Sequence, residues 1–369
     1  MQKKKKYLLF YVQKLTGVRD MNGRYATLKD VAKLAGTTAS TVSYVLNDSK
    51  ERYISDEMRR RVLEAAKDLN YVKCSVASSL KGEKRKIIAV LVPQFSNQFF
   101  TRIILAIENV ADQFDYVLTI YNTFDDPKRE KVIINRMAQH RMDGYIIIPT
   151  YEGVKNTEQL RKIGIPMVVM DRPLEGIDDF IWVTTNNYQC GYKGGHYLAS
   201  KGHRNIAFIG WNSRINDLDS RKNGFWDALA ASGITSEEAI VIDGEFSEED
   251  GYKMTKNLLK TRPDITAIFY GYNVQAQGGV RYLMEENIEI GKDISVMLIG
   301  SPEWAVTGYN NFTHIEQDEY KLGKSAATIL FSIINGENQE NIQNIIQDCS
   351  LYEGNSVYDI TKTKKERML

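Results

Sequence analysis

The segment from Thr38 to Asn47 carries side chains whose chemistry suits contact with the bases of DNA. If the segment is helical, residues three and four apart are neighbours on its surface. One outward face would then carry Ala39, Ser40, Ser43 and Tyr44. A serine hydroxyl can bond several base edges, and an alanine methyl can touch the methyl group of thymine. Side chains this small offer few bidentate base contacts, so the prediction of DNA binding depends on the three-helix arrangement that positions this face.

A first short helix is predicted just before this surface. Thr27 is placed to cap it, with Asp30 in the reciprocal capping position. Its apolar face is expected to comprise Val31, Leu34 and Ala35. Gly36 follows at once and permits the backbone geometry that a sharp turn needs.

Two further helices complete the unit. Thr38 is placed to cap the second and Ser55 the third. We expect their inward faces to be Val42, Val45 and Leu46 in the second helix, and Val62, Leu63, Ala66 and Leu69 in the third. Three small helices with such a turn form a helix-turn-helix unit, whose second helix enters the major groove of DNA.

This region resembles the DNA-binding headpiece of the lac repressor (LacI/GalR) family of bacterial transcriptional regulators. The resemblance is carried by residues 27–47, 62–66, 69–71 and 76–80. It implies DNA contacts by Thr27, Thr38, Ala39, Ser40, Thr41, Ser43, Tyr44 and Asn47, and by Val76, Ala77 and Leu80 of a hinge helix that orders when two copies pair on DNA.

Leu80 matches the family position whose leucine wedges into the minor groove and kinks the duplex. The family usually has Pro-Asn where this chain has Lys73 and Cys74, and bulkier or polar residues at Ala39 and Ser40. A plain linker is the alternative to the hinge helix. Small recognition residues shift the expected specificity toward Tyr44, Asn47, the Leu80 kink and DNA shape.

From Ile87 onward, apolar strands alternate with helical patterns. The run Ile87–Val92 is of the kind that parallel sheets bury on both faces. Strands are predicted over residues 116–121, 144–149, 166–170, 205–209, 239–242, 267–270 and 295–299. Helices are predicted over residues 99–114, 127–141, 156–163, 189–201, 219–232, 248–260 and 274–286. The fold class is thus α/β: a helix-turn-helix headpiece and hinge helix, then a two-lobed doubly wound domain similar to periplasmic binding proteins.

The expected domain boundaries follow from these patterns. Residues 25–72 form the DNA-binding domain and 73–85 the hinge helix and linker. Residues 86–360 form the effector-binding and dimerisation domain, with lobe 1 over about 86–183 and 311–337 and lobe 2 over about 184–310 and 338–360. Residues 361–369 read as a disordered tail. Residues 1–24 read as an extension, because family headpieces begin near Met21; a basic arm that adds non-specific DNA affinity is the alternative.

Charge and cysteine usage fit this organisation. The chain has a formal net charge of +1, yet Met21 to Lys86 holds 14 Lys and Arg against 8 Asp and Glu, a balance of +6 (14 − 8). A basic headpiece suits phosphate contacts at one end of the protein. Cys74, Cys190 and Cys349 show no paired or metal-like spacing, which indicates reduced thiols in the cytoplasm. No apolar run reaches the length of a membrane span, so no membrane association is expected.

The resemblance also implies an effector site between the lobes. Its residues would be Phe95, Asn97, Phe100, Asp171, Arg172, Trp182, Arg221, Phe246 and Asn273. In family members that bind sugars, the matching arginine and carboxylates grip hydroxyls and an aromatic residue packs on the ring. Three family carboxylates are missing here, at Asn186, Asn273 and the Gly300 region. We therefore expect a more electropositive pocket that takes a sugar phosphate or acid sugar, with three alternatives: a neutral sugar or nucleoside, no effector, or substitutions that only shape loops.

The leading prediction is a sequence-specific transcriptional repressor that binds a palindromic operator as a homodimer and responds to a small sugar-like metabolite, either anionic or neutral. The alternative is a cytosolic sugar-sensing protein with little sequence-specific DNA readout. An enzyme is not expected, because no phosphate-cradling glycine loop, metal cluster or nucleophile elbow is visible and the four histidines are scattered. No cofactor and no metal are expected.

The hinge assignment makes a testable prediction. Leu80→Ala should weaken operator binding through loss of the minor-groove wedge and leave the lobes folded. Operator affinity of the variant, compared with the wild-type chain, measures this. An unchanged affinity would argue against Leu80 as the wedge.

Overall fold

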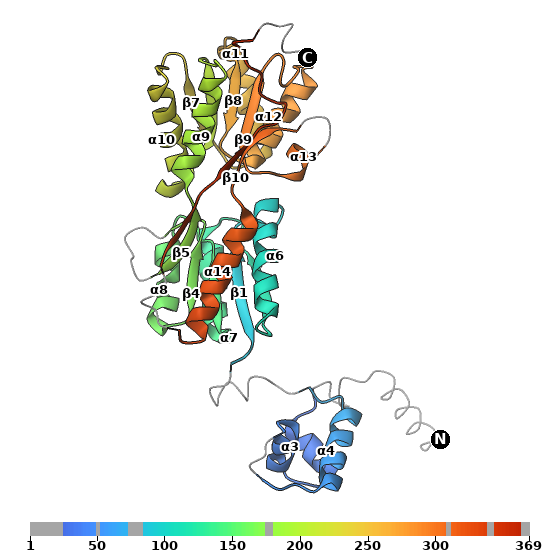
Figure 1. Ribbon diagram of the computed structural model, residues 1–369. Coiled ribbons are helices and arrows are strands. Elements are labelled where there is room, and N and C mark those ends of the chain that lie inside the picture. The colour runs from blue at the N-terminus through green and yellow to red at the C-terminus, as the bar shows by residue number, and fades with distance from the viewer. Residues whose placement is uncertain are drawn as a thin grey trace, which may run out of the picture. The chain divides into compact units, whose positions relative to one another are not determined.

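The computed structural model describes residues 25–48, 52–72, 84–173, 180–307, 311–337 and 343–362. These belong to two compact units that divide after Arg85, and each unit is described by itself (Figure 1). The predicted extension over residues 1–24, the hinge residues Val76, Ala77 and Leu80, and most of the predicted tail lie outside the described residues. Among the described residues, no helix combines the length and the apolar character that crossing a membrane requires.

Three helices form the first unit: α2 (Leu28–Ala35), α3 (Ala39–Leu46) and α4 (Asp56–Asp68). The predicted capping box is confirmed, since Asp30 Oδ2 accepts from Thr27 N at 2.8 Å and Thr27 Oγ1 accepts from Asp30 N at 3.4 Å. Thr38 and Ser55 cap α3 and α4 as predicted. Gly36 ends α2 with φ of 64°, the left-handed geometry that glycine adopts without strain.

Two expected core residues of this unit are exposed. Leu34 is 54% exposed and Leu63 is 50% exposed, whereas Ala32 and Ala65 are buried. The buried set is Val31, Ala32, Ala35, Val42, Val45, Val62 and Ala65. The predicted stripes are otherwise confirmed, and the two errors arise because small alanines fill the space between the closely packed helices where the larger leucines were expected.

The first lobe is a six-stranded sheet with helices on both faces. Its strands are β1 (Ile87–Val92), β2 (Val117–Asn122), β3 (Gly144–Ile147), β4 (Met167–Met170), β5 (Ile181–Thr185) and β11 (Ile345–Gln347), in the order β11-β5-β4-β3-β1-β2. Residues of β1 alternate between two cores, as a pleated strand requires. Ile88, Val90 and Val92 pack with α6 (Gln98–Asp112) and α14 (Glu319–Ile334). Ala89 and Leu91 pack with α7 (Pro127–His140) and α8 (Gly153–Ile163).

The second lobe repeats this architecture. Its strands are β6 (Ile206–Trp211), β7 (Ile240–Gly244), β8 (Ala267–Tyr270), β9 (Ser295–Ile299), β10 (Thr313–Glu316) and β12 (Ser350–Tyr352), in the order β12-β10-β9-β8-β6-β7. Helices α9 (Asn187–Ser200) and α10 (Asn216–Ala231) share a core with one face. Helices α11 (Glu248–Thr261) and α12 (Asn273–Glu285) cover the other face, and the short α13 spans Glu303–Val306.

The chain passes between the lobes three times, and two expected assignments are corrected there. Residues 311–337 were expected in lobe 1; α14 packs there, but β10 pairs with β9 of the second sheet, with Thr313 opposite Met297. Residues 338–360 were expected in lobe 2; β12 belongs there, but β11 pairs with β5 of the first sheet, with Ile345 opposite Val183. The strands β5, β11 and β12 were not predicted. Short strands at sheet edges carry little periodicity, and their sequence does not reveal which sheet will pair with them.

Glycines allow α9 and α10 to approach closely. A Cβ at Gly191 would collide with the carbonyl oxygen of Arg221, and a Cβ at Gly224 would collide with that of Tyr188. Backbone atoms cannot move aside as side chains can, so no larger residue fits at this crossing. The close approach brings residues at the beginning of α9 within bonding distance of α10.

We expect Gly224→Ala to lower the free energy of unfolding by about 2 kcal/mol, because the added methyl forces the two helices apart. The matched control is Asn223→Ala, an exposed neighbour on α10, which should change stability by less than about 0.5 kcal/mol. Denaturant unfolding of both variants measures the difference. Equal stabilities would mean that the helices adjust to the methyl without cost.

Candidate functional site

A cavity of about 40 Å³, partly open to solvent, lies between the two lobes. Its lining follows the carboxyl ends of strands from both sheets, where doubly wound sheets bind ligands. The lining residues are Asn97, Phe99, Phe100, Asp171, Arg172, Trp211, Leu218, Arg221, Phe246, Tyr272, Asn273, Ile299, Gly300 and Gln317.

Three aromatic rings of the second lobe form one wall. The rings of Trp211, Phe246 and Tyr272 contact one another, with centroid distances of 5.0 to 5.7 Å. Two guanidinium groups lie over them: Arg172 is 5.4 Å from the Trp211 ring and Arg221 is 4.6 Å from the Tyr272 ring. Such a wall can pack against a ring-shaped ligand. Cation–π attraction to the same wall holds the two guanidinium groups in place.

Arg221 is held by α9 and by the loop after β8. Its Nε donates to Asn187 Oδ1 at 2.8 Å, and its Nη1 donates to Gly271 O at 2.7 Å. Asn187 Nδ2 in turn donates to Asp217 Oδ2 at 2.6 Å. Burial raises the pKa of Asp217 to about 6. The Asn187 amide therefore links a buried cation to a carboxylate whose ionisation is costly.

Arg172 and Asp171 form the floor on the first-lobe side. Arg172 Nη1 lies 2.6 Å from Asp125 Oδ1 and also donates to Pro149 O at 3.1 Å. The buried Arg172 Nε makes no hydrogen bond among the described residues, although Asp171 Oδ2 lies 3.8 Å away. Burial raises the pKa of Asp171, and its backbone has φ of 65°. A donor without an acceptor beside a strained residue is typical of a binding site.

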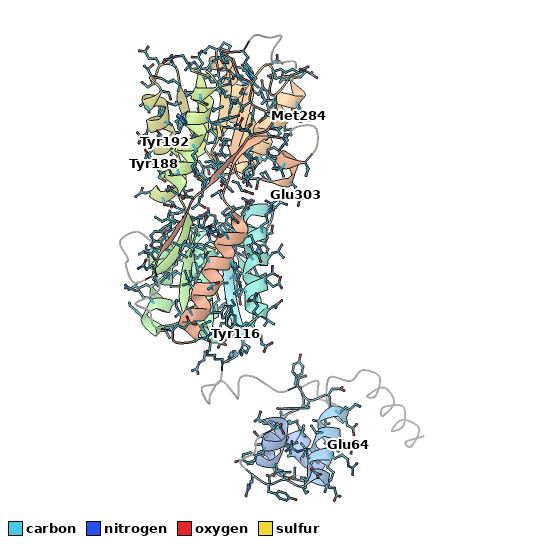
Figure 2. All side chains as sticks on the ribbon, in the orientation of Figure 1. Glu64, Tyr116, Tyr188, Tyr192, Met284 and Glu303 are labelled. Carbon is cyan, nitrogen blue, oxygen red and sulfur yellow. The ribbon has the colours of Figure 1, made fainter. Side chains whose placement is uncertain are left out.

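Hydrogen bonds join the lobes at the cavity and beside it. The amides of Asn97 and Asn273 bond reciprocally at 3.0 and 3.4 Å. Arg102 Nη1 donates to Ser301 O at 3.0 Å. The backbone N–H of Glu303 donates to Gln98 Oε1 at 2.8 Å, and Figure 2 shows Glu303 at the junction. Any change in the angle between the lobes must break or lengthen these contacts.

The structure brings seven of the nine predicted effector residues to the cavity: Asn97, Phe100, Asp171, Arg172, Arg221, Phe246 and Asn273. It does not bring Phe95 or Trp182 there. Phe95 is 43% exposed in the turn after β1. Trp182 lies near the amino end of β5, where its backbone N–H donates to Asn344 Oδ1, while the cavity lies at the carboxyl ends.

The cavity lining itself holds two guanidinium groups, those of Arg172 and Arg221, and one carboxylate, that of Asp171, while further carboxylates lie just outside it. Three nearby carboxylates balance the guanidinium charges of Arg172 and Arg221. They belong to Asp125, Asp171 and Asp217. Asn186 caps α9 by accepting from Gln189 N at 3.1 Å, so this substitution shapes a helix terminus. Sequence reasoning missed Trp211, Leu218, Asp217 and Gln317. The signal for Trp211 was its position at the carboxyl end of β6.

Of the predicted DNA-contacting residues in the described headpiece, all but Thr27 lie on or beside α3, and Thr27 caps α2. Ser40 and Asn47 are exposed, while Ala39, Thr41, Ser43 and Tyr44 are half-buried. Some of their polar atoms are already bonded: Asn47 Nδ2 donates to Ser43 Oγ at 3.2 Å, and the hydroxyls of Thr38 and Thr41 bond each other at 3.0 Å. Arg61 Nη2 donates to Ala35 O at 2.6 Å and so ties α4 to the end of α2.

Two family models and a transcriptional repressor match this chain. Residues 27–73 match the family model described as bacterial regulatory proteins, lacI family. Residues 85–354 match the model of periplasmic binding proteins and the sugar binding domain of the LacI family. The HTH-type transcriptional repressor PurR of Erwinia tasmaniensis is 33% identical over 335 residues, covering 90% of this chain and 97% of that protein.

Two solved structures share the fold. A LacI-family transcriptional regulator from Silicibacter pomeroyi superposes with a TM-score of 0.77 at 25% identity, covering 90% of this chain and 99% of the other. The lac repressor dimer bound to operator and the anti-inducer ONPF superposes with a TM-score of 0.75 at 24% identity, covering 91% and 100%.

The raised pKa of Asp217 predicts a pH-dependent stability. The folded protein holds this proton more tightly than the unfolded chain, so ionisation costs folding free energy as pH rises from about 4 through about 6. We expect Asp217→Asn to match the wild type near pH 3 to 4 and to be more stable by roughly 1 to 3 kcal/mol above pH 7. Denaturant unfolding across pH measures this. A difference that does not vary with pH would contradict the assignment.

Proposed function

This chain belongs to the LacI family of bacterial regulatory proteins, and on that premise we propose that it represses transcription by binding a palindromic operator as a homodimer, under control of a small sugar-like metabolite held between its lobes. The observation that carries the proposal is the union of two features in one chain. A capped helix-turn-helix precedes a two-lobed domain whose cavity is lined by aromatic rings and buried guanidinium groups. Acting on DNA, the protein would work in the cytoplasm.

The shape of the headpiece supports operator binding by two copies. One headpiece presents a single recognition helix, which reads one half-site, so two copies would read a two-fold symmetric site. The relative that was solved on its operator is a dimer. In this chain Ser40 and Asn47 offer exposed polar groups to base edges. Contacts between the headpiece and the DNA phosphates would fix the position of the recognition helix on the duplex.

The cavity supports a sugar-like effector rather than a strongly anionic one. Aromatic faces pack on the apolar face of a sugar ring, and the donor at Arg172 Nε together with the Asp171 carboxylate can bond hydroxyls. Because Asp125, Asp171 and Asp217 offset Arg172 and Arg221, an added phosphate would lack an unmatched cation. We therefore favour a neutral sugar over the sugar phosphate or acid sugar.

Control of DNA binding would pass through the lobe angle. A ligand that competes with the Asn97–Asn273 amide pair, or adds contacts across it, favours one arrangement of the lobes over another. That preference is the coupling free energy between effector and DNA, typically 1 to 3 kcal/mol. Its sign, release or promotion of DNA binding, follows from which arrangement lets two hinge segments pair.

Selection of genomic fragments by the pure protein, followed by footprinting, tests the repressor proposal. The expected result is a set of sites sharing one two-fold symmetric sequence, each protected by two chains. Binding to all fragments with equal affinity would instead support the sugar-sensing alternative with little sequence-specific readout.

A thermal-shift screen with Arg221→Ala tests the effector site. A ligand that binds the native state raises Tm, so one or more neutral sugars should raise Tm of the wild type and fail with the variant. Lys222→Ala is the matched control, since Lys222 pairs with Asp219 and Asp243 outside the cavity. A response that survives in Arg221→Ala would place the effector elsewhere, and a response confined to sugar phosphates or acid sugars would contradict the charge argument.

A further inference from the structure

Two cysteines that lie 159 positions apart (349 − 190) meet where the lobes join. Cys190 is on the first turn of α9, and Cys349 lies in the connection between β11 and β12. Both are buried, with 0% and 3% exposure, and both belong to the same apolar cluster of the second lobe. Both thiols are free, and each shifts the pKa of the other, raising that of Cys190 and lowering that of Cys349.

The backbone around the pair is tied as well. Lys193 is one turn after Cys190 on the same face of α9, and its Nζ donates to the Cys349 carbonyl oxygen at 2.5 Å. The backbone N–H of Asn186, just before α9, donates to Gln347 O at 2.7 Å. The third connection between the lobes thus runs against the beginning of α9 over several residues.

We propose that Cys190 and Cys349 form a reversible disulfide that fastens the third inter-lobe connection to α9, so that an oxidant such as a peroxide stiffens the hinge between the lobes. Two free thiols in one buried cluster, with the Cys349 carbonyl already tied to α9, need only a small rearrangement to approach disulfide geometry. The connection they would fasten changes direction whenever the lobes rotate, because β11 belongs to the first sheet and β12 to the second. This inference goes beyond effector control and does not depend on it.

The chemistry balances with hydrogen peroxide as the oxidant. The Cys190 thiol and the Lys193 ammonium lower the pKa of Cys349, whereas burial raises that of Cys190. The Cys349 thiolate attacks one peroxide oxygen, the O–O bond breaks, and a sulfenic acid and one water form. The Cys190 sulfur then attacks the Cys349 sulfur, the S–O bond breaks, and a second water leaves with the remaining protons. Two thiols are oxidised to one disulfide and one peroxide is reduced to two waters; a dithiol reverses the reaction.

Burial sets the rate of this step. Since neither thiol is open to solvent, peroxide reaches Cys349 only when the junction opens locally. Formation should therefore be slow in the closed arrangement and faster in an open one.

The first experiment identifies the bond. The full chain carrying Cys74→Ser, which retains only the two cysteines of interest, is treated with hydrogen peroxide, alkylated and digested without reduction. The expected mass spectrum contains a Cys190–Cys349 cross-linked peptide that dithiothreitol removes. The matched control, Cys74→Ser with Cys349→Ser, should give no intramolecular cross-link and retain the reduced fold by circular dichroism. Oxidation to separate sulfinic acids, or thiols that stay alkylable, would overturn the proposal.

The second experiment tests the hinge. Hydrogen exchange of the amides over residues 343–352 should slow at least about tenfold in the disulfide form and return to the original rate with dithiothreitol. The disulfide would also close the long loop between positions 190 and 349, which should raise Tm by about 5 °C or more. A disulfide that forms without slowing exchange in this segment would overturn its role at the hinge.

Discussion

The structure depends on the burial of two guanidinium groups between two lobes. A buried cation is tolerated only when hydrogen bonds and opposite charges replace its water, and Arg221 obtains these from Asn187, Gly271 and the Tyr272 ring. Those partners come from α9, from the loop after β8 and from the aromatic wall. The requirement therefore fixes how α9, α10 and the strand ends of the second sheet lie relative to one another. Gly191 and Gly224 permit the close helix contact on which this arrangement rests.

The same requirement explains why the cavity is both polar and rigid. Arg172 is anchored by Asp125 and Pro149 in the first lobe and stacks on Trp211 in the second, so it belongs to both. The Asn97–Asn273 pair adds a neutral bridge beside it. Hydrogen-bond donors and acceptors around a ligand here are held in place before it binds, so less conformational entropy is lost on binding. The ligand also lies beside contacts that already join the lobes, so its binding can change the angle between them.

Local signals in the sequence were enough to predict part of this. The Thr27–Asp30 capping box and the Gly36 turn depend on neighbours within a few residues, and both are as predicted. The resemblance to a family assigned Asn97, Asp171 and Arg221 to one effector site, and they meet in one cavity. Trp182 was wrongly assigned to the cavity because β5 was not predicted. Without that strand, the sequence did not show that Trp182 lies near its amino end, away from the cavity. The contact between Cys190 and Cys349 could not be foreseen, since it arises from sheet pairings that short strands do not encode.

The interleaving of the two lobes has a consequence for synthesis on the ribosome. The first sheet ends at β11, and one of its faces is covered by α14, yet both segments come after the whole second-lobe series from β6 to β10. A nascent chain that has emerged only as far as β5 exposes an unpaired strand edge and an uncovered apolar face. At typical elongation rates of about 5 to 20 residues per second, that interval lasts on the order of ten seconds. The amino-terminal lobe, although begun first, is thus completed only when almost the whole chain has been made, and a chaperone would shield its exposed edge until then.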